Sequence, residues 1–161
     1  DESMENASVS GIAFQKDQIK FTLHGVGDTP GTAFKILGPV SDAEVEVDVI
    51  VQNVSVDGKT DFTFTVASED KDTVKELLDK LKDDVSYTEL IIDSNIAKVS
   101  IVGVGMRSQA GIASKAFKAL SENGVNIQII CTSEIKITMV IEKELVDKAV
   151  TVLHKEFELE K

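Results

Sequence analysis

Residues 102–141 read VGVGMRSQAGIASKAFKALSENGVNIQIICTSEIKITMVI and predict the order strand, helix, strand, strand. The first β-forming run gives out at Gly103. Apolar side chains then recur at helical spacing as far as Leu120, which predicts an amphipathic helix. Gly124 predicts the end of this helix, because glycine readily adopts the left-handed conformation of a C-cap. Two β-rich runs follow within residues 125–141.

The same order of elements is predicted for residues 21–66. Gly31 and Val45 in this earlier stretch are separated by the same interval as Gly111 and Val125 in the later one. A repeat at a fixed spacing indicates a repeated structural unit, so we expect two modules of one architecture.

Each module is predicted to be a ferredoxin-like βαββαβ unit, which gives an α+β fold class. The first module covers residues 16–95. The second, residues 96–161, lacks a convincing closing strand, because residues 157–161 are too short to form one. A strand within residues 7–15 can fill that place, so module two is expected to be split, with module one inserted into it. Helices should cover one face of each sheet.

Polar residues predict the ends of several elements in module one. Turns are expected at residues 16–18 and 93–95, where the chain would pass between the modules. The first helix is expected to begin near residues 28–30 and to end around Gly38 and Pro39. The next strand should begin at Val45 and turn back in a hairpin at Asp57-Gly58.

The composition excludes several classes of function. Lys and Arg total 17 and Asp and Glu total 28, so the net charge is −11, which disfavours nucleic acid and anionic membranes as partners. No apolar run reaches the length of a transmembrane helix. Cys131 is the only cysteine, so no intramolecular disulfide can form and a cytoplasmic location is expected.

Two glycine-bearing strand-to-helix turns, residues 25–31 and 103–111, are candidate binding loops. Such a turn directs unpaired N–H groups and the positive end of a helix towards a carboxylate or phosphate. The phosphate-loop motif GxxxxGK[ST] is absent, and Ser108 stands at the third glycine of the dinucleotide fingerprint. Nucleotide binding is therefore not expected. The sequence also shows no metal-binding cluster of suitable ligand spacing and no pattern of a nucleophile with its base.

Asp28 has two possible roles on physical grounds alone. It could cap the first helix, or its carboxylate could pair with the ammonium group of a ligand whose own carboxylate binds the helix N-terminus. Gln52 could donate and accept hydrogen bonds with a ligand, or it could be an ordinary residue at a strand end. Asn126 and Ile127 open the corresponding strand of module two, and residues 132–134 form a polar turn.

Two phrases carry a family resemblance, VQNVSVDGKTDFTFTV at residues 51–66 and the stretch 102–141 quoted above. Both closely resemble the C-terminal regulatory region of bacterial aspartokinases, a pair of ACT modules, and the resemblance covers nearly the whole chain from about Met4. It implies feedback inhibition by lysine and threonine, bound at interfaces between ACT modules. It also implies a partner, the aspartokinase catalytic domain or subunit. A homodimer is expected on physical grounds, because each sheet has only one face covered by helices and single modules of this size are marginally stable alone.

The resemblance does not extend to a kinase domain, so the chain alone is not expected to be an enzyme. ATP and magnesium would belong to that domain, and no cofactor or metal is expected in this chain. The sequence begins at Asp1 rather than Met, which favours an excised piece over a separately made regulatory subunit. A different class of function stays open, a purely structural dimerisation module without ligand.

The resemblance implies two effector pockets and assigns neither effector to either of them. The first comprises a loop, a strand-end glutamine and a dipeptide of the other module: Asp28, Pro30, Gly31, Thr32, Ala33, Gln52, Asn126 and Ile127. The second comprises the related loop and turn of module two: Met106, Ser108, Gly111, Ile112, Ala113, Ser133 and Glu134. Gln109-Ala110 stands where many relatives carry His-Pro, and this difference is expected to loosen the second loop.

Overall fold

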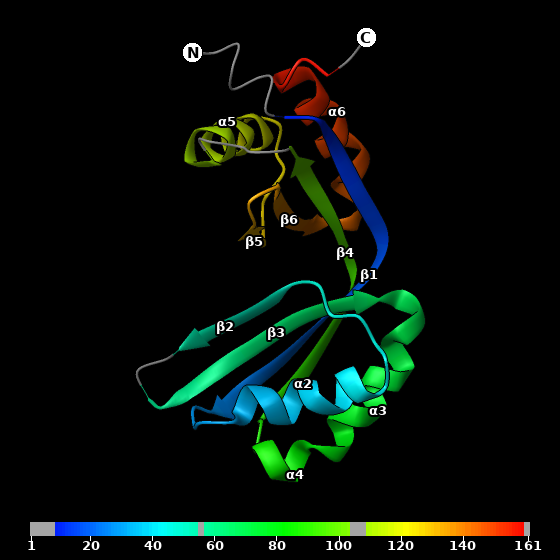
Figure 1. The fold of residues 1–161 in the computed structure, drawn as a ribbon, viewed down its shortest axis with the longest axis vertical. Coiled ribbons are helices and arrows are strands. Elements are labelled where there is room, and N and C mark those ends of the chain that lie inside the picture. Colours follow the sequence, from blue (N-terminus) through cyan, green and yellow to red (C-terminus); the bar gives the residue numbers. More distant parts are fainter. Residues whose placement is uncertain (1–8, 55–56, 104–108, 160–161) are drawn as a thin grey trace. The chain divides into compact units, whose positions relative to one another are not determined.

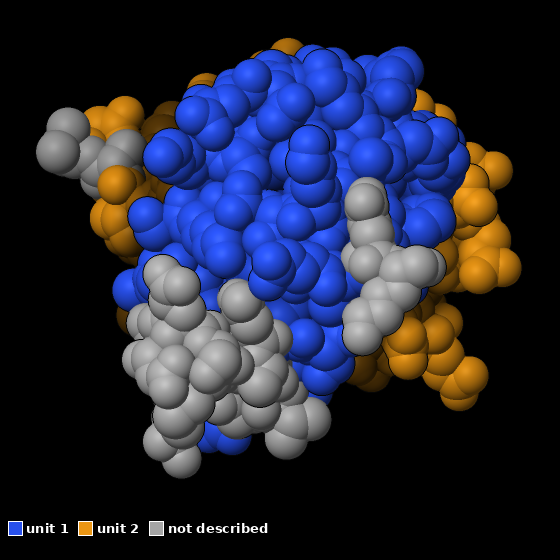
Figure 2. Space-filling view, turned by 90° about the horizontal axis from the view of Figure 1, so that it is seen from above, with its two compact units in different colours: residues 1–16, 95–161 blue, residues 17–94 orange. Residues whose placement is uncertain are grey.

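The computed structural model describes residues 9–54, 57–103 and 109–159. The chain divides into two compact units, unit 1 with residues 1–16 and 95–161 and unit 2 with residues 17–94 (Figure 2). The sequence of unit 2 is thus inserted into that of unit 1. From the sequence, module one was predicted to cover residues 16–95, and module two to cover residues 7–15 together with residues 96–161. No helix in the described ranges is long and apolar enough to cross a membrane.

Unit 2 contains one helical layer on one face of an antiparallel sheet with the order β2-β3-β1-β4 (Figure 1). Its elements in chain order are β1 (Gly11–Gly27), α2 (Thr32–Asp42), β2 (Ile50–Val54), β3 (Lys59–Ala67), η1 (Ser68–Asp70), α3 (Lys71–Lys80), α4 (Lys82–Val85) and β4 (Glu89–Val102). Only the part of β1 from residue 17 and the part of β4 up to residue 94 belong to this unit.

Unit 1 repeats the plan with the strand order β1-β4-β6-β5. Its further elements are α5 (Gln109–Glu122), β5 (Ile129–Thr132), β6 (Lys136–Glu142), η2 (Lys143–Leu145) and α6 (Val146–Glu156). The N-terminal segment takes the closing position beside β4, where the Ser10 amide donates to the Val102 carbonyl at 2.7 Å. The predicted α+β class and the filling of the missing strand by the N-terminal segment are confirmed.

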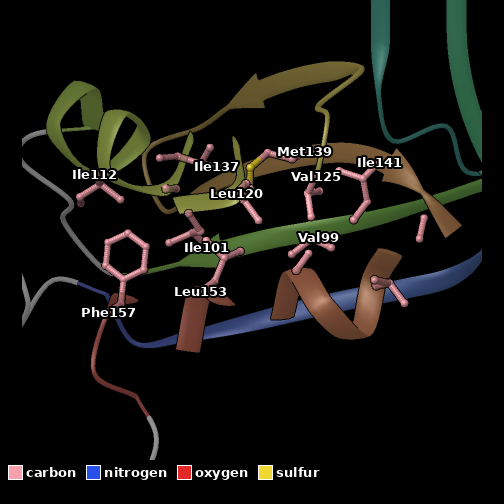
Figure 3. Packing of buried hydrophobic residues seen from close by; sticks show 14 of the residues in the cluster. Val99, Ile101, Ile112, Leu120, Val125, Ile137, Met139, Ile141, Leu153 and Phe157 are labelled. Carbon is pink, nitrogen blue, oxygen red and sulfur yellow. The ribbon is translucent and has the colours of Figure 1, made fainter. Parts of the chain in front are cut away.

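The two cores differ in the side chains that fill them. In unit 1 mostly aliphatic residues of β4 and β6 pack against α5 and α6, including Val99, Ile101, Ile112, Leu120, Ile137, Met139, Ile141 and Leu153 (Figure 3). In unit 2 aromatic residues are prominent: Phe21, Phe62, Phe64 and Tyr87. Within unit 2 the Tyr87 hydroxyl donates to the Leu78 carbonyl at 3.0 Å. Alternate residues of each strand thus bury one apolar face under the helices.

The turns predicted at residues 16–18 and 93–95 are wrong. Both stretches lie inside continuous strands, β1 and β4, and Gln18 pairs with Ala67 of β3. In unit 2 the Lys20 ammonium also lies 3.9 Å from the Asp93 carboxylate. Cross-strand partners outweigh the local turn preference of these polar residues. The chain therefore passes between the units twice within a strand.

Helix α2 begins and ends later than predicted. It begins at Thr32, because Thr29 precedes a proline and a residue in that position is disfavoured in the helical region. Gly31, with φ of 90°, is the residue before the helix. The helix continues past Pro39, whose carbonyl accepts the amide of Ala43 at 3.1 Å. Pro39 cannot donate a backbone hydrogen bond, but it does not end α2, which continues to Asp42.

The strands that follow α2 and α5 begin later than Val45 and Val125, at Ile50 and Ile129. The first residues after each helix bond back to that helix and cannot pair in a strand. Sheet-like contact starts before the regular strand, since the Asp48 amide donates to the Thr65 carbonyl at 3.3 Å. The predicted hairpin at residues 57–58 is confirmed between β2 and β3.

Candidate functional site

The first candidate loop connects β1 to α2 in unit 2. The Asp28 amide donates to the Gly58 carbonyl at 2.9 Å, so the loop is fastened to the β2–β3 hairpin. Thr32 is buried, and its hydroxyl lies 3.2 Å from the Gly27 carbonyl and 2.9 Å from that of Thr29. These contacts hold the loop from its inner side. The outer side is left to solvent.

Asp28 does not cap the helix. Gly31 occupies the N-cap position, no side chain caps α2, and its first turn contains no acidic residue. The Asp28 side chain is exposed, and in the described part of the chain it makes no hydrogen bond or ion pair. The capping interpretation is therefore wrong. An unpaired carboxylate lies in the loop before a helix N-terminus whose N–H groups carry partial positive charge.

The remaining residues of the first predicted pocket are divided between the two units. In unit 2, Pro30 and Ala33 are exposed beside Gly31, and Gln52 is exposed on the edge strand β2. In unit 1, Asn126 is exposed between α5 and β5, while Ile127 packs partly against the core. That all these residues form one pocket stays a prediction.

The second candidate site lies in unit 1, where the end of β4, the start of α5 and the β5–β6 turn converge. The Gly103 amide donates to the Ile135 carbonyl at 2.8 Å. The Gln109 side-chain amide donates to the Ser133 carbonyl. The Ser133 amide in turn donates to the Lys136 carbonyl at 2.9 Å, closing the turn. These bonds bring two segments of the predicted second pocket, the start of α5 and the β5–β6 turn, next to the end of β4.

The individual residues of this second site have different surroundings. Ile112 is buried in the core of unit 1, so its side chain is not presented to solvent. Gly111 and Glu134 are exposed, and Ala113 is half-buried. Met106 and Ser108 lie outside the described residues, as does the loop that Gln109-Ala110 was expected to loosen. Gln109 itself begins α5 and ties it to the turn.

Sequence reasoning missed a hollow of about 330 Å³ in unit 2, beside the β2–β3 hairpin. His24 Nδ1 lies 2.6 Å from Asp61 Oδ1, which also accepts the Gly25 amide at 3.2 Å. Thr88 donates its hydroxyl to the His24 carbonyl at 2.9 Å. None of the predicted pocket residues lines this hollow. Its polar groups bond to one another and fix the end of β1 to β3.

A metal centre is not supported within the described ranges. These residues contain no group of three or more His, Cys, Asp or Glu side chains that could hold a metal ion. The described parts of the candidate sites offer hydrogen-bonding groups, carboxylates and the N-terminus of α2.

Comparison with known proteins identifies the architecture. Residues 23–85 and 99–157 each match the ACT domain. The regulatory subunit of aspartate kinase from Thermus thermophilus is 33% identical with a TM-score of 0.87, over 93% of this chain and 99% of that one. A chain in a crystal structure of aspartokinase alpha and beta subunits is 46% identical with the same TM-score, over 94% and 99%. The chain belongs to the aspartokinase regulatory family.

The curated aspartokinases are longer than this chain. The aspartate kinase of Pseudomonas fluorescens is 54% identical over 160 residues, which are 99% of this chain and 39% of the relative. The chain thus matches the regulatory part of an aspartokinase, and the kinase domain of these relatives is not among its 161 residues. Each ACT match falls within one unit, residues 23–85 in unit 2 and 99–157 in unit 1.

Proposed function

We propose that this aspartokinase regulatory chain binds lysine and threonine in the cytoplasm and controls an aspartate kinase domain or subunit by feedback inhibition. It would need no cofactor of its own, since ATP and magnesium would bind the kinase domain. The exposed, unpaired carboxylate of Asp28 ahead of an uncapped helix N-terminus carries the proposal.

The chemistry of the first loop suits a free amino acid. The ligand carboxylate would bind the first N–H groups of α2, which have no partner within the helix. The ligand ammonium would pair with Asp28 in a charge-assisted hydrogen bond. Gln52 could both donate to and accept from the threonine hydroxyl. If the bound ligand covers the Gln52 amide, an apolar isostere such as valine would leave that amide unpaired and should be rejected.

The edge strands support a homodimer as part of the same proposal. β2 and β5 are the outer strands of their units and carry exposed apolar side chains, including Ile50, Val54 and Ile130. An unpaired edge of this kind is a template for another chain. If Asn126 and Ile127 complete the first pocket from a second chain, effector binding and dimerisation are coupled.

The test is calorimetric titration of the chain with lysine and threonine, singly and together, followed by dimer dissociation with threonine, with valine and with neither. We expect saturable binding of both effectors and tighter dimers with threonine than with valine. Equal dissociation constants in all three conditions would contradict an interface site. A stable dimer that binds neither amino acid would favour the structural dimerisation module, which the exposed edge strands also fit.

A further inference from the structure

Strand β1 of unit 2 contains a β-bulge just before the first candidate loop. The register of β1 against β3 shifts between Leu23 and Val26. In β1 two residues lie between these positions, His24 and Gly25, whereas in β3 only Asp61 lies between their partners. Two residues opposite one are a β-bulge. Gly25 has a φ of 72°, which a glycine adopts without strain, so the sequence is suited to a bulge at this point.

The bulge is held from both neighbouring strands. Asp61 Oδ1 lies 2.6 Å from His24 Nδ1 and accepts the Gly25 amide at 3.2 Å. On the β4 side, the Thr88 amide and hydroxyl both donate to the His24 carbonyl, at 2.8 Å and 2.9 Å. A Cβ atom at Gly25 would lie 2.6 Å from Thr88 Oγ1, so the backbone is closely packed there. A single oxygen of Asp61 thus contacts both residues of the bulge.

The bulge decides which face of the sheet the end of β1 turns towards the helices. Leu23 is buried in the core of unit 2, and strict alternation would next turn Gly25 towards that core. Because of the extra residue, Val26 is the next core side chain instead. Asp28 follows Val26 by two residues, the interval at which residues of an extended chain share a face. The bulge therefore assigns Asp28 to the face that the helices cover.

Gln52 of the proposed first pocket lies on this same face. It pairs with Phe62 of β3, which belongs to the core of unit 2. Residues directly opposite each other in an antiparallel pair share a face. Without the extra residue in β1, the alternation would place Asp28 on the face opposite to Gln52, and one small ligand could not contact both.

We propose that Asp61 is a positioning residue of the first effector pocket, because it holds the bulge that brings Asp28 to the face of Gln52. The inference rests on the proposed function, in which Asp28 and Gln52 bind the effector. Asp61 precedes the core residue Phe62 and so belongs to the face that the helices leave uncovered. It therefore acts through Asp28 and not by contact with the effector.

The inference is tested by calorimetric titration of the full chain with L-threonine. Asp61→Ala removes the acceptor of both bulge residues and should weaken threonine binding roughly tenfold, within the range of couplings in one hydrogen-bonded network. Asp61→Asn keeps an oxygen that can accept the Gly25 amide and should recover most of this affinity. No recovery would contradict the role given to the acceptor oxygen. Thr63→Val is the matched control in β3. It removes the 3.1 Å hydroxyl contact with Thr22 and should leave the affinity near the wild type.

A double-mutant cycle shows whether Asp61 acts through Asp28. In the Asp28→Ala chain, Asp61→Ala should cause no further loss of threonine affinity, because no carboxylate is left to position. Losses that multiply would show that Asp61 acts on the pocket by another route, and they would overturn the inference. The fluorescence of Tyr87, which lies in the core of unit 2, shows before each titration that the unit is folded.

The wild-type chain supplies a test that does not depend on the folding of any variant. Coupling is reciprocal, so bound threonine should slow hydrogen exchange of the Gly25 amide more than that of Phe21, which lies in β1 outside the bulge. Equal exchange at Gly25 with and without threonine would show that the inference is wrong while effector binding stands. The same holds if Asp61→Ala binds threonine as tightly as Thr63→Val. A wild-type chain that binds no threonine would overturn the proposed function together with this inference.

Discussion

The two units share a topology, but one equivalent core position holds a phenylalanine in unit 2 and a methionine in unit 1. Phe64 pairs with Ile50 on the edge strand of unit 2, as Met139 pairs with Ile130 in unit 1. The Phe64 ring stacks on Phe21 with the centroids 5.7 Å apart, whereas a methionine fills its space with a flexible thioether. The fold therefore requires an apolar strand face and does not require one particular core.

The units also differ where their candidate binding loops meet a helix. α2 begins at Thr32, behind Pro30, whereas α5 begins at Gln109 and includes Ala110, the residue that aligns with Pro30. Alanine favours a helix, while a residue that precedes a proline is disfavoured in one. The backbone therefore enters the following helix differently in the two candidate loops.

The largest expected effect is on the aromatic core. Phe64→Ala should cost about 3–5 kcal/mol of unfolding free energy in unit 2. Tyr87 is the only tyrosine and the chain has no tryptophan, so intrinsic tyrosine fluorescence reports unit 2 alone. The denaturant midpoint of that signal should fall.

Met139→Ala is the matched variant in unit 1. It should cost about 2–5 kcal/mol there and leave the tyrosine transition in place, while hydrogen exchange in β6 accelerates. A tyrosine midpoint that falls equally in both variants would show that the units unfold together and do not behave as separate cores.

Asp28 separates the first loop from the second, where a serine, Ser108, aligns with it. Asp28→Ala should weaken threonine binding by about 2–4 kcal/mol, because the ligand ammonium loses its partner. Since Asp28 caps nothing, its replacement should change the unfolding free energy by less than about 0.5 kcal/mol. Calorimetry measures the threonine affinity, and thermal unfolding measures the stability. Asp42→Ala, at the exposed far end of α2, is the control. Undiminished threonine affinity would remove Asp28 from the pocket.

The residues just beyond α2 and α5 compare a non-glycine with a glycine at positive φ. Glu44 of unit 2 has a φ of 61°, and Gly124 of unit 1 has a φ of 74°. Gly124→Glu should cost about 1–2 kcal/mol, because a side chain at positive φ is strained. Glu44→Gly should stabilise unit 2 by up to about 1 kcal/mol for the same reason. Urea unfolding of the two variants measures both. If the signs were not opposite, strain at positive φ would not be the main effect of a side chain at these two positions.

The smallest effect concerns Tyr87, a titratable group in the core of unit 2. Burial raises the pKa of its hydroxyl above 10.0; Asp79 also raises it and Lys75 opposes the change. As pH rises past 10.0 the unfolded chain loses this proton before the folded chain does, so unit 2 loses stability. Tyr87→Phe should remove that pH dependence and cost about 1 kcal/mol at neutral pH, through the loss of the bond to Leu78. Unfolding in urea at pH 8 and above pH 10, followed by circular dichroism, checks both.

The sequence predicted the repeated topology because periodicity and helix stops are local signals. The displaced strand could also be inferred, since module two visibly lacked an end. The continuity of β1 could not, because Asp17 and Gln18 favour turns locally and become strand residues only beside β3. The true cap of α2 was missed for a similar reason. Asp28 has the right chemistry for an N-cap, but Pro30 moves the start of the helix beyond its reach.

The candidate sites were predicted only as sets of residues. The family resemblance, and not the spacing of the loops, joined Ser133 and Glu134 to the loop before α5 in the second predicted pocket. In the structure Gln109 at the start of α5 bonds to Ser133, while the pocket itself stays a prediction. The contact of His24 with Asp61 had no such signal. It depends on the register of β1 and β3, including an irregularity between Leu23 and Val26, and no local pattern encodes this register.

The insertion of unit 2 into unit 1 sets an order of events during synthesis. The strand that closes unit 1 leaves the ribosome before any of unit 2, and its partner β4 is complete only after unit 2 has emerged. At about 5–20 residues per second, unit 2 has several seconds in which to fold before the helices of unit 1 exist. The first part of β1 can therefore pair with β4 only after the whole of unit 2 has been made, and the helices that cover this pair arrive later still.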